Sequence, residues 1–248
     1  MKIIPAIDII NGKCVQLISG KRGTEKYYGD PIEIAVKWEN VGAEVLHVID
    51  LDATFGRGNN VSVVLKIKKN VKIPINFGGG IRDVAKANSI LESGIDRIIL
   101  GTLAINDYFN NFKALRELTS IWNPGRIIIA LDSKNGSIII NGWQESTIFK
   151  VTKEIMKQYE NFCWGFLYTN VDVEGQMKGL SSNDINEISR IVKSTNKPVI
   201  ISGGITTDED IENILKTGAW GIVLGKALYE NSLDFRKLIK DVHNNTDY

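Results

Sequence analysis

The sequence predicts an α/β protein that forms a single (β/α)8 barrel, the TIM-barrel fold, with an internal twofold half-barrel repeat. Three observations lead to this prediction. The chain has 248 residues, a usual length for one such barrel. Eight short apolar runs alternate with amphipathic stretches of helical period, as in parallel α/β folds. Several motifs also recur at a spacing of half the chain.

The predicted strands are eight short runs rich in Ile and Val, each bounded by polar residues or Gly: 3–7, 44–49, 72–77, 97–100, 126–131, 163–168, 198–201 and 220–224. The clearest predicted helices are 32–40, 84–93, 184–194 and 208–216. Continuous apolar runs are typical of parallel strands buried on both faces. An open doubly wound sheet could also hold eight such units. No nucleotide-binding fingerprint follows the first strand, so the pattern favours a closed barrel.

The repeat relates the two halves of the chain, roughly 1–124 and 125–248, within one predicted domain spanning 1–248. An Ala-Ile-Asp triplet in the first strand matches an Ala-Leu-Asp triplet in the fifth, and Gly-Gly-Ile and Leu-Gly motifs recur in the same way. The offset is 124 residues for each pair: Asp8 and Asp132, Gly80 and Gly204, Gly101 and Gly225. Two half-barrels would place these pairs opposite each other across one barrel mouth.

The composition of the chain excludes several classes of binding partner and protein. Thirty Lys and Arg against 29 Asp and Glu leave a formal charge of +1, which offers no broad basic surface for nucleic acid. The two cysteines, Cys14 and Cys163, stand alone and suggest neither a disulfide framework nor a metal site. No run is long enough for a membrane helix, and the N-terminus does not resemble a signal peptide. We expect a cytoplasmic monomer that acts on a small molecule, without cofactor or metal.

Two aspartates are the first candidates for catalysis. Active sites of these barrels lie at the carboxyl ends of the strands, and Asp8 and Asp132 close predicted strands one and five. Facing carboxylates near apolar walls can acquire different pKa values, so that one donates and the other accepts a proton. Thr169 closes the sixth strand and could hydrogen-bond a reacting hydroxyl. Each of the three could instead only cap a turn.

Glycine clusters follow the third, fourth, seventh and eighth strands. Glycine allows the backbone to approach an oxyanion closely, and a following helix N-terminus directs N–H groups at it. Phosphate sites on opposite sides of the mouth would suit a bis-phosphorylated substrate, although any single cluster could merely relieve crowding at a turn. The candidate phosphate-binding residues are Gly79, Gly80, Gly101, Thr102, Ser202, Gly203, Gly204, Gly225 and Lys226.

Three residues of the second strand and its end are further candidates. His47 could contact substrate or serve as a hydrogen-bonded structural residue. Asp50 and Asp52 follow it, and we expect one to orient a loop and the other to face the cavity.

Two connections are long enough to act as lids. The first contains residues 20–24, and its Arg22 could contact phosphate. The second contains an Asn-Gly pair at 135–136, which predicts a short hairpin. Trp143 follows in this connection and could contact a base or pack beneath the loop.

The most specific motifs are Ile4-Pro5-Ala6-Ile7-Asp8 with Asn11-Gly12-Lys13, His47-Val48-Ile49-Asp50-Leu51-Asp52, Phe77-Gly78-Gly79-Gly80-Ile81-Arg82, Gly142-Trp143 and Leu224-Gly225-Lys226-Ala227-Leu228-Tyr229. With them the chain resembles, over nearly its whole length, the phosphoribosylformimino aminoimidazole carboxamide ribotide (ProFAR) isomerases of histidine biosynthesis. The resemblance implies an Amadori rearrangement of an aminoaldose to an aminoketose without cofactor or metal. It also implies that Asp8 is the general base for the C2 proton, that Asp132 is the general acid for the ring oxygen, and that Thr169 assists.

The chain departs from this family after the sixth strand. Many members carry an acidic residue at the position of Asn170 and Asp-Gly at 174–175, where this chain has Glu174-Gly175, whereas Asp172 is kept. We expect altered local hydrogen bonding there.

The sequence is also compatible with three other functions. One is a dual-substrate isomerase that also serves tryptophan biosynthesis. A second is the cyclase subunit of imidazole glycerol phosphate synthase, which usually has Cys-Leu-Asp in strand one and lacks the Gly-Trp hairpin. The third is a non-catalytic barrel that binds a phosphorylated ligand, for which paired carboxylates would have no use.

Overall fold

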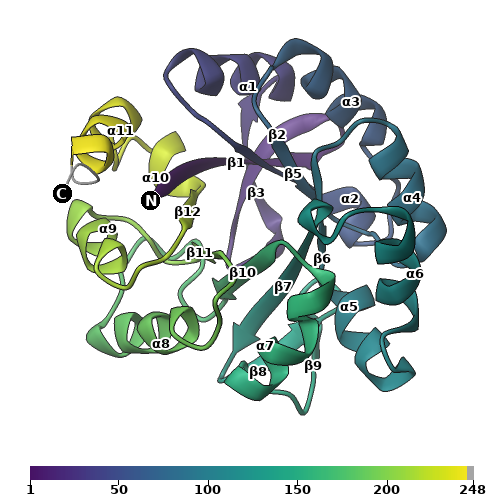
Figure 1. Ribbon diagram of the computed structural model, residues 1–248. Coiled ribbons are helices and arrows are strands. Elements are labelled where there is room, and N and C mark those ends of the chain that lie inside the picture. Colours follow the sequence, from purple (N-terminus) through teal and green to yellow (C-terminus); the bar gives the residue numbers. More distant parts are fainter. Residues whose placement is uncertain (245–248) are drawn as a thin grey trace.

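The computed structural model describes residues 1–244 and contains a closed barrel of eight parallel strands (Figure 1). The strands are β1 (Lys2–Ile10), β4 (Leu46–Asp50), β5 (Ile75–Gly78), β6 (Arg97–Leu100), β7 (Ile127–Lys134), β10 (Gly165–Asn170), β11 (Val199–Ser202) and β12 (Gly221–Leu224). Each pairs in parallel with its neighbours, and the pairings β12–β1 and β10–β7 complete the ring. The predicted barrel is confirmed, and every predicted strand overlaps an observed one.

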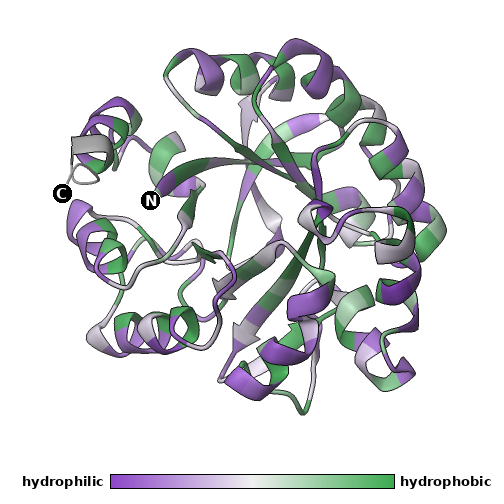
Figure 2. Ribbon diagram, viewed as in Figure 1, coloured by the Kyte–Doolittle hydropathy of each residue, from purple (hydrophilic) through white to green (hydrophobic). Residues whose placement is uncertain are grey.

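Helices form an outer ring around the strands (Figure 1). They are α1 (Pro31–Asn40), α2 (Leu51–Thr54), α3 (Val61–Asn70), α4 (Val84–Glu92), α5 (Thr102–Asp107), α6 (Lys113–Ile121), α7 (Lys153–Tyr159), α8 (Ser182–Val192), α9 (Asp208–Leu215), α10 (Lys226–Tyr229) and α11 (Phe235–Asn244), with short 3-10 turns at Tyr108–Asn110, Pro124–Arg126 and Glu160–Phe162. Hydrophobic residues recur along these helices on the sides that face the strands (Figure 2). Of the helices in residues 1–244, none has the length and apolar character needed to cross a membrane.

Local sequence fixes where several helices begin. Asp30 caps α1 by accepting a hydrogen bond from the Ile32 amide, and Pro31 occupies the first turn, where its missing N–H costs nothing. Capping boxes start α8 at Ser181 and α9 at Thr207. These caps set the register of helices that cover the later strands.

The apolar core has two layers because side chains alternate along each strand. The larger layer lies between strands and helices and includes Ile7 and Phe77. The smaller fills the barrel interior and includes Ile4, Ala6 and Ala130. Since Ile4 and Ala6 point inward, the same alternation directs Asp8 to the interior at its mouth.

Two hairpins extend from the barrel strands over the mouth. The first connection, which we expected to be a loop, is an antiparallel hairpin of β2 (Lys13–Ile18) and β3 (Lys21–Gly29), with β2 paired to the end of β1. The predicted second hairpin is confirmed: β7 pairs with β8 (Ser137–Ile140), which in turn pairs with β9 (Glu145–Ser146). Its turn residues have φ values of 50° and 76°, which suit Asn-Gly.

The close approach of β4 to the glycine cluster after β5 generates a stability prediction. A Cβ on Gly79 would lie 2.3 Å from the Asp50 carbonyl oxygen, at a φ of +108°. We expect Gly79→Ala to lower the free energy of unfolding by about 3 kcal/mol or more. The alanine would be strained at this positive φ, and the backbone at Asp50 would also have to move away from the new Cβ. Gly94 has a similar φ of +95° with no heavy atom within 4 Å of the added Cβ, so Gly94→Ala should cost only about 1 kcal/mol. Urea unfolding of both variants measures the difference, and equal losses would refute the packing argument.

Candidate active site

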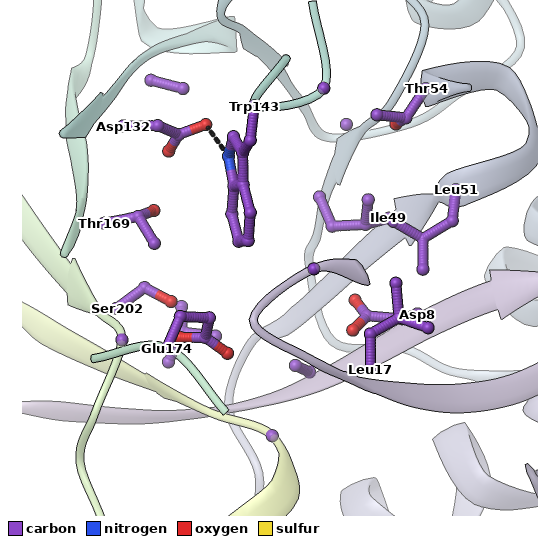
Figure 3. Close-up of a pocket in the computed structure, with 18 of the residues that line it drawn as sticks. Asp8, Leu17, Ile49, Leu51, Thr54, Asp132, Trp143, Thr169, Glu174 and Ser202 are labelled. Atoms are coloured by element: carbon purple, nitrogen blue, oxygen red, sulfur yellow. Dashed lines mark hydrogen bonds between the residues drawn. The ribbon is translucent and has the colours of Figure 1, made fainter. Parts of the chain in front are cut away.

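One pocket at the carboxyl ends of the barrel strands gathers fourteen of the seventeen candidate residues. Asp8, Asp132 and Thr169 line it, together with the glycine clusters, His47 and Trp143. Figure 3 shows the Asp8 and Asp132 carboxyls on different sides of the cavity, with the Trp143 ring extending into the space between them. The sequence-derived site is therefore one continuous cavity.

Asp8 lies on β1 and faces the cavity with a weakly acidic carboxyl. Burial raises its pKa to about 7, and the nearby Glu174 carboxylate raises it in the same direction. The Gln16 side chain opposes this effect, because its Nε2 donates a hydrogen bond of 3.2 Å to Asp8 Oδ2. A carboxyl of this kind is partly ionised near neutral pH, so it can accept a proton there.

Asp132 lies on β7 and is held by the second hairpin. Trp143 Nε1 donates a hydrogen bond of 2.8 Å to Asp132 Oδ2 (Figure 3). Burial raises the pKa of Asp132, whereas hydrogen bonds from Trp143 and Thr169 lower it. Thr169 reaches Asp132 because the two residues are direct partners in the β7–β10 ladder. The carboxyl is thus oriented by two donors.

Glu174 is a third carboxyl in the pocket, and sequence reasoning noted it only as a departure from the family. Burial raises its pKa to about 7, and the Asp132 charge adds to the rise, while Lys226 opposes it. Lys226 Nζ also donates to the Gly175 carbonyl at 3.1 Å, which joins this segment to α10. Glu174 lies four residues beyond the end of β10, so it is not among the polar residues that close the predicted strands.

The glycine clusters shape two similar edges of the pocket. A Cβ on Gly203 would lie 2.4 Å from the Asn170 carbonyl oxygen, a contact equivalent to that of Gly79 with Asp50. Gly101 precedes α5 and Gly225 precedes α10 with nearly the same backbone angles, φ −100° and ψ −92° against φ −107° and ψ −103°. No side chain caps either helix, so the first N–H groups of both can serve an anion.

His47 lines the pocket as a neutral group. Burial lowers the pKa of its imidazole to about 4, so at neutral pH one ring nitrogen donates and the other accepts a hydrogen bond. The ring can therefore contact a substrate hydroxyl or phosphate without adding charge. Among residues 1–244, no three His, Cys, Asp or Glu side chains are grouped so that they could hold a metal ion.

Three of the candidate residues, Asp50, Asp52 and Arg22, lie outside the pocket lining. Asp50 is fully buried, where its carboxylate accepts hydrogen bonds from the Ala53 amide and from both the amide and the side chain of Asn60. Asp52 likewise accepts from the Asn11 amide at 2.6 Å, so both aspartates hold loops and neither faces the cavity. Arg22 is exposed on the first hairpin, with its guanidinium 5.4 Å from the centre of the Phe55 ring.

Comparison with known proteins adds an independent observation. The family described as "Histidine biosynthesis protein" matches residues 2–234. Three relatives are named 1-(5-phosphoribosyl)-5-((5-phosphoribosylamino)methylideneamino) imidazole-4-carboxamide isomerase. That of Methanocaldococcus jannaschii is 41% identical over 98% of this chain and 100% of its own. Those of Methanosphaera stadtmanae and Archaeoglobus fulgidus are 42% and 40% identical, over 97% and 96% of this chain and 99% and 97% of their own.

The raised pKa of Glu174 predicts a pH-dependent cost in stability. Below pH 4.5 the folded and unfolded states are both protonated. Between pH 4.5 and about 7 the folded state keeps a proton that the unfolded state releases, so stability falls as pH rises through this window. We expect Glu174→Gln to raise the free energy of unfolding at pH 8 by on the order of 1–2 kcal/mol and to have little effect at pH 4.

Chemical unfolding at the two pH values measures this effect. Glu117→Gln, at an exposed position of α6, is the matched control and should show no such pH dependence. A gain for Glu174→Gln that is the same at pH 4 and pH 8 would contradict the electrostatic explanation.

Proposed function

The chain belongs to the histidine biosynthesis protein family and is an isomerase, and we propose that it catalyses the Amadori rearrangement of the bis-phosphorylated ProFAR aminoaldose to the corresponding aminoketose. One observation carries this proposal: the Asp8 and Asp132 carboxyls lie on different sides of a single pocket, on strands β1 and β7, and the glycine clusters after β5–β6 and β11–β12 line the same pocket. The name that the relatives share mentions two phosphoribosyl groups, and this supports a substrate with two phosphates.

The two edges would bind the two phosphates. One edge consists of Gly79, Gly80, Gly101 and Thr102, and the other of Ser202, Gly203, Gly204, Gly225 and Lys226. Uncapped N–H groups at α5 and α10 suit phosphate oxygens, and the Lys226 ammonium adds charge at one edge. A substrate anchored at both ends would have its reacting ribose held between the carboxyls, which lowers the entropic cost of reaction.

The reaction needs one acid and one base. The acid protonates the ring oxygen as the C1–O bond opens, which leaves a protonated imine at C1. The base then removes the C2 proton, and the electron pair moves to neutralise the imine and give an enolamine. The C2 hydroxyl of the enolamine releases its proton as C1 gains one, which yields the ketone at C2. We assign Asp8 as the base, because its weakly acidic carboxyl faces the cavity and is partly ionised at neutral pH. No electrons leave the substrate, so the step requires no redox partner.

The acid is assigned to Asp132, with Thr169 assisting, and Glu174 is a second carboxyl able to supply the proton. Burial raises the pKa of Asp132, and the hydrogen bonds from Trp143 and Thr169 oppose that rise. Burial raises the pKa of Glu174 to about 7, which keeps it partly protonated near neutral pH. An acid works best when its pKa lies near the working pH. The relative effects of removing each carboxyl therefore decide between them.

The first prediction from this mechanism concerns turnover. Asp8→Asn and Asp132→Val should each reduce kcat by at least about 10²-fold, the lower end of what a positioned acid or base contributes, while the fold remains intact. A spectrophotometric assay on the ProFAR aminoaldose measures the effect, and circular dichroism checks the fold. Activity within tenfold of wild type for either variant would remove its assigned role. A well-folded wild type that does not convert this aminoaldose would overturn the proposed function.

The second prediction separates the two candidate acids. If Asp132 supplies the proton, Asp132→Asn should lower kcat by about 10²-fold or more, and Glu174→Gln should lower it far less. The high-pH limb of kcat should also persist in Glu174→Gln, because the ionising acid is still present. Loss of that limb in Glu174→Gln alone would transfer the acid role to Glu174. Glu117→Gln serves again as the control that leaves kcat unchanged.

A further inference from the structure

We propose that Gln16, a residue of the first hairpin, is a positioning residue for Asp8 and links the base to the phosphate-binding edge at Gly225. This inference rests on the proposed function, because it assigns Asp8 the role of base. It goes beyond that function by giving the hairpin a part in the chemistry rather than only in covering the site.

The contact between Gln16 and Asp8 is direct and sheltered. Gln16 is only 6% exposed and lines the same pocket as Asp8. Its Nε2 donates to Asp8 Oδ2 at 3.2 Å, from a strand that pairs antiparallel with the end of β1. A hydrogen bond to a carboxylate fixes its rotation and favours its ionised form, which is the form that accepts a proton.

The Gln16 amide also lies close to Gly225. A Cβ built on Gly225 would lie 2.5 Å from Gln16 Oε1 and 3.3 Å from its Nε2. An added side chain at this position would therefore require the Gln16 amide to move. Gly225 immediately precedes α10, at the edge proposed to bind one phosphate. Gln16 therefore lies between the proposed base and that phosphate edge.

Several other groups act on Asp8 and must be separated from Gln16. Burial raises the pKa of Asp8, and the Glu174 carboxylate raises it further. His47 on β4, Asp132 on β7 and Lys226 on α10 also line this pocket. Cys14 on β2 and Tyr229 on α10 lie outside the lining and interact electrostatically with Asp8. Glu174 titrates in the same range as Asp8, so its removal is needed for a clean measurement.

The test replaces the amide with an apolar side chain of nearly the same shape. Gln16→Met removes the donor, and the titration of Asp8 should then move upward by about half to one pH unit. Carbon-13 NMR of labelled aspartate follows the Asp8 carboxyl in the Glu174→Gln background, with Asp8→Asn to assign the signal. Gln158→Met, at an exposed position of α7, is the matched control and should leave the titration unchanged.

Kinetics provide a second readout in the Glu174-containing enzyme. The low-pH limb of kcat/KM for the aminoaldose should move upward in Gln16→Met, with kcat reduced and KM changed less than about threefold. Gly225→Ala, which leaves Gln16 in the chain but displaces its amide, should move the Asp8 titration in the same direction. It therefore tests the contact without altering β2.

The outcomes are distinct. An Asp8 titration that is unchanged in both Gln16→Met and Gly225→Ala overturns the inference, even if turnover falls, because the loss is then structural. Failure of wild type to convert the aminoaldose refutes the proposed function instead, and the NMR titration still decides whether Gln16 acts on Asp8.

Discussion

Closure of eight parallel strands into one barrel is the constraint on which the site depends. Closure places the carboxyl ends of all the strands around one mouth, so residues far apart in sequence line one cavity. Alternation along β1 and β7 then decides which side chains point inward, since Ala6 and Ala130 face the interior two residues before Asp8 and Asp132. Burial above this apolar interior removes water from both carboxyls and raises the pKa of each.

Gathering three carboxyls in one dehydrated pocket opposes folding, and the surrounding groups limit that cost. Charge is kept low because burial favours the protonated forms of Asp8 and Glu174 near neutral pH and the neutral form of His47. Lys226 is the nearby cation that favours ionised Glu174. The burial that costs stability also brings the pKa values of Asp8 and Glu174 to about 7, so under the proposed mechanism stability and activity oppose each other.

Sequence reasoning identified what local patterns encode. The alternation of apolar runs and helical stretches predicted the barrel. Polar residues at strand ends identified Asp8, Asp132 and Thr169, and the glycine clusters identified the residues at both edges of the pocket. It missed Gln16 and Glu174, because each reaches the pocket from a segment outside the barrel strands. Charged and glycine residues at 20–24 suggested a loop, whereas pairing of β2 with β1 and β3 forms a hairpin. Such long-range pairing has no local signature. Asp50 shows the converse limit, since three hydrogen bonds turn its carboxylate toward the Ala53 and Asn60 amides.

In each half of the barrel, the carboxyl proposed to be catalytic receives a hydrogen bond from the hairpin that follows its strand. Asp8 receives a hydrogen bond from Gln16 of the hairpin that follows β1, and Asp132 receives one from Trp143, which follows the hairpin strand β8. The two hairpins also meet, because a Cβ on Gly20 would lie 2.4 Å from the Trp143 ring. The barrel thus fixes where the carboxyls stand, and the hairpins supply the donors that orient them. Because a hairpin can change its donor without disturbing the strands beneath it, the acidity of each carboxyl can be altered while the barrel is retained.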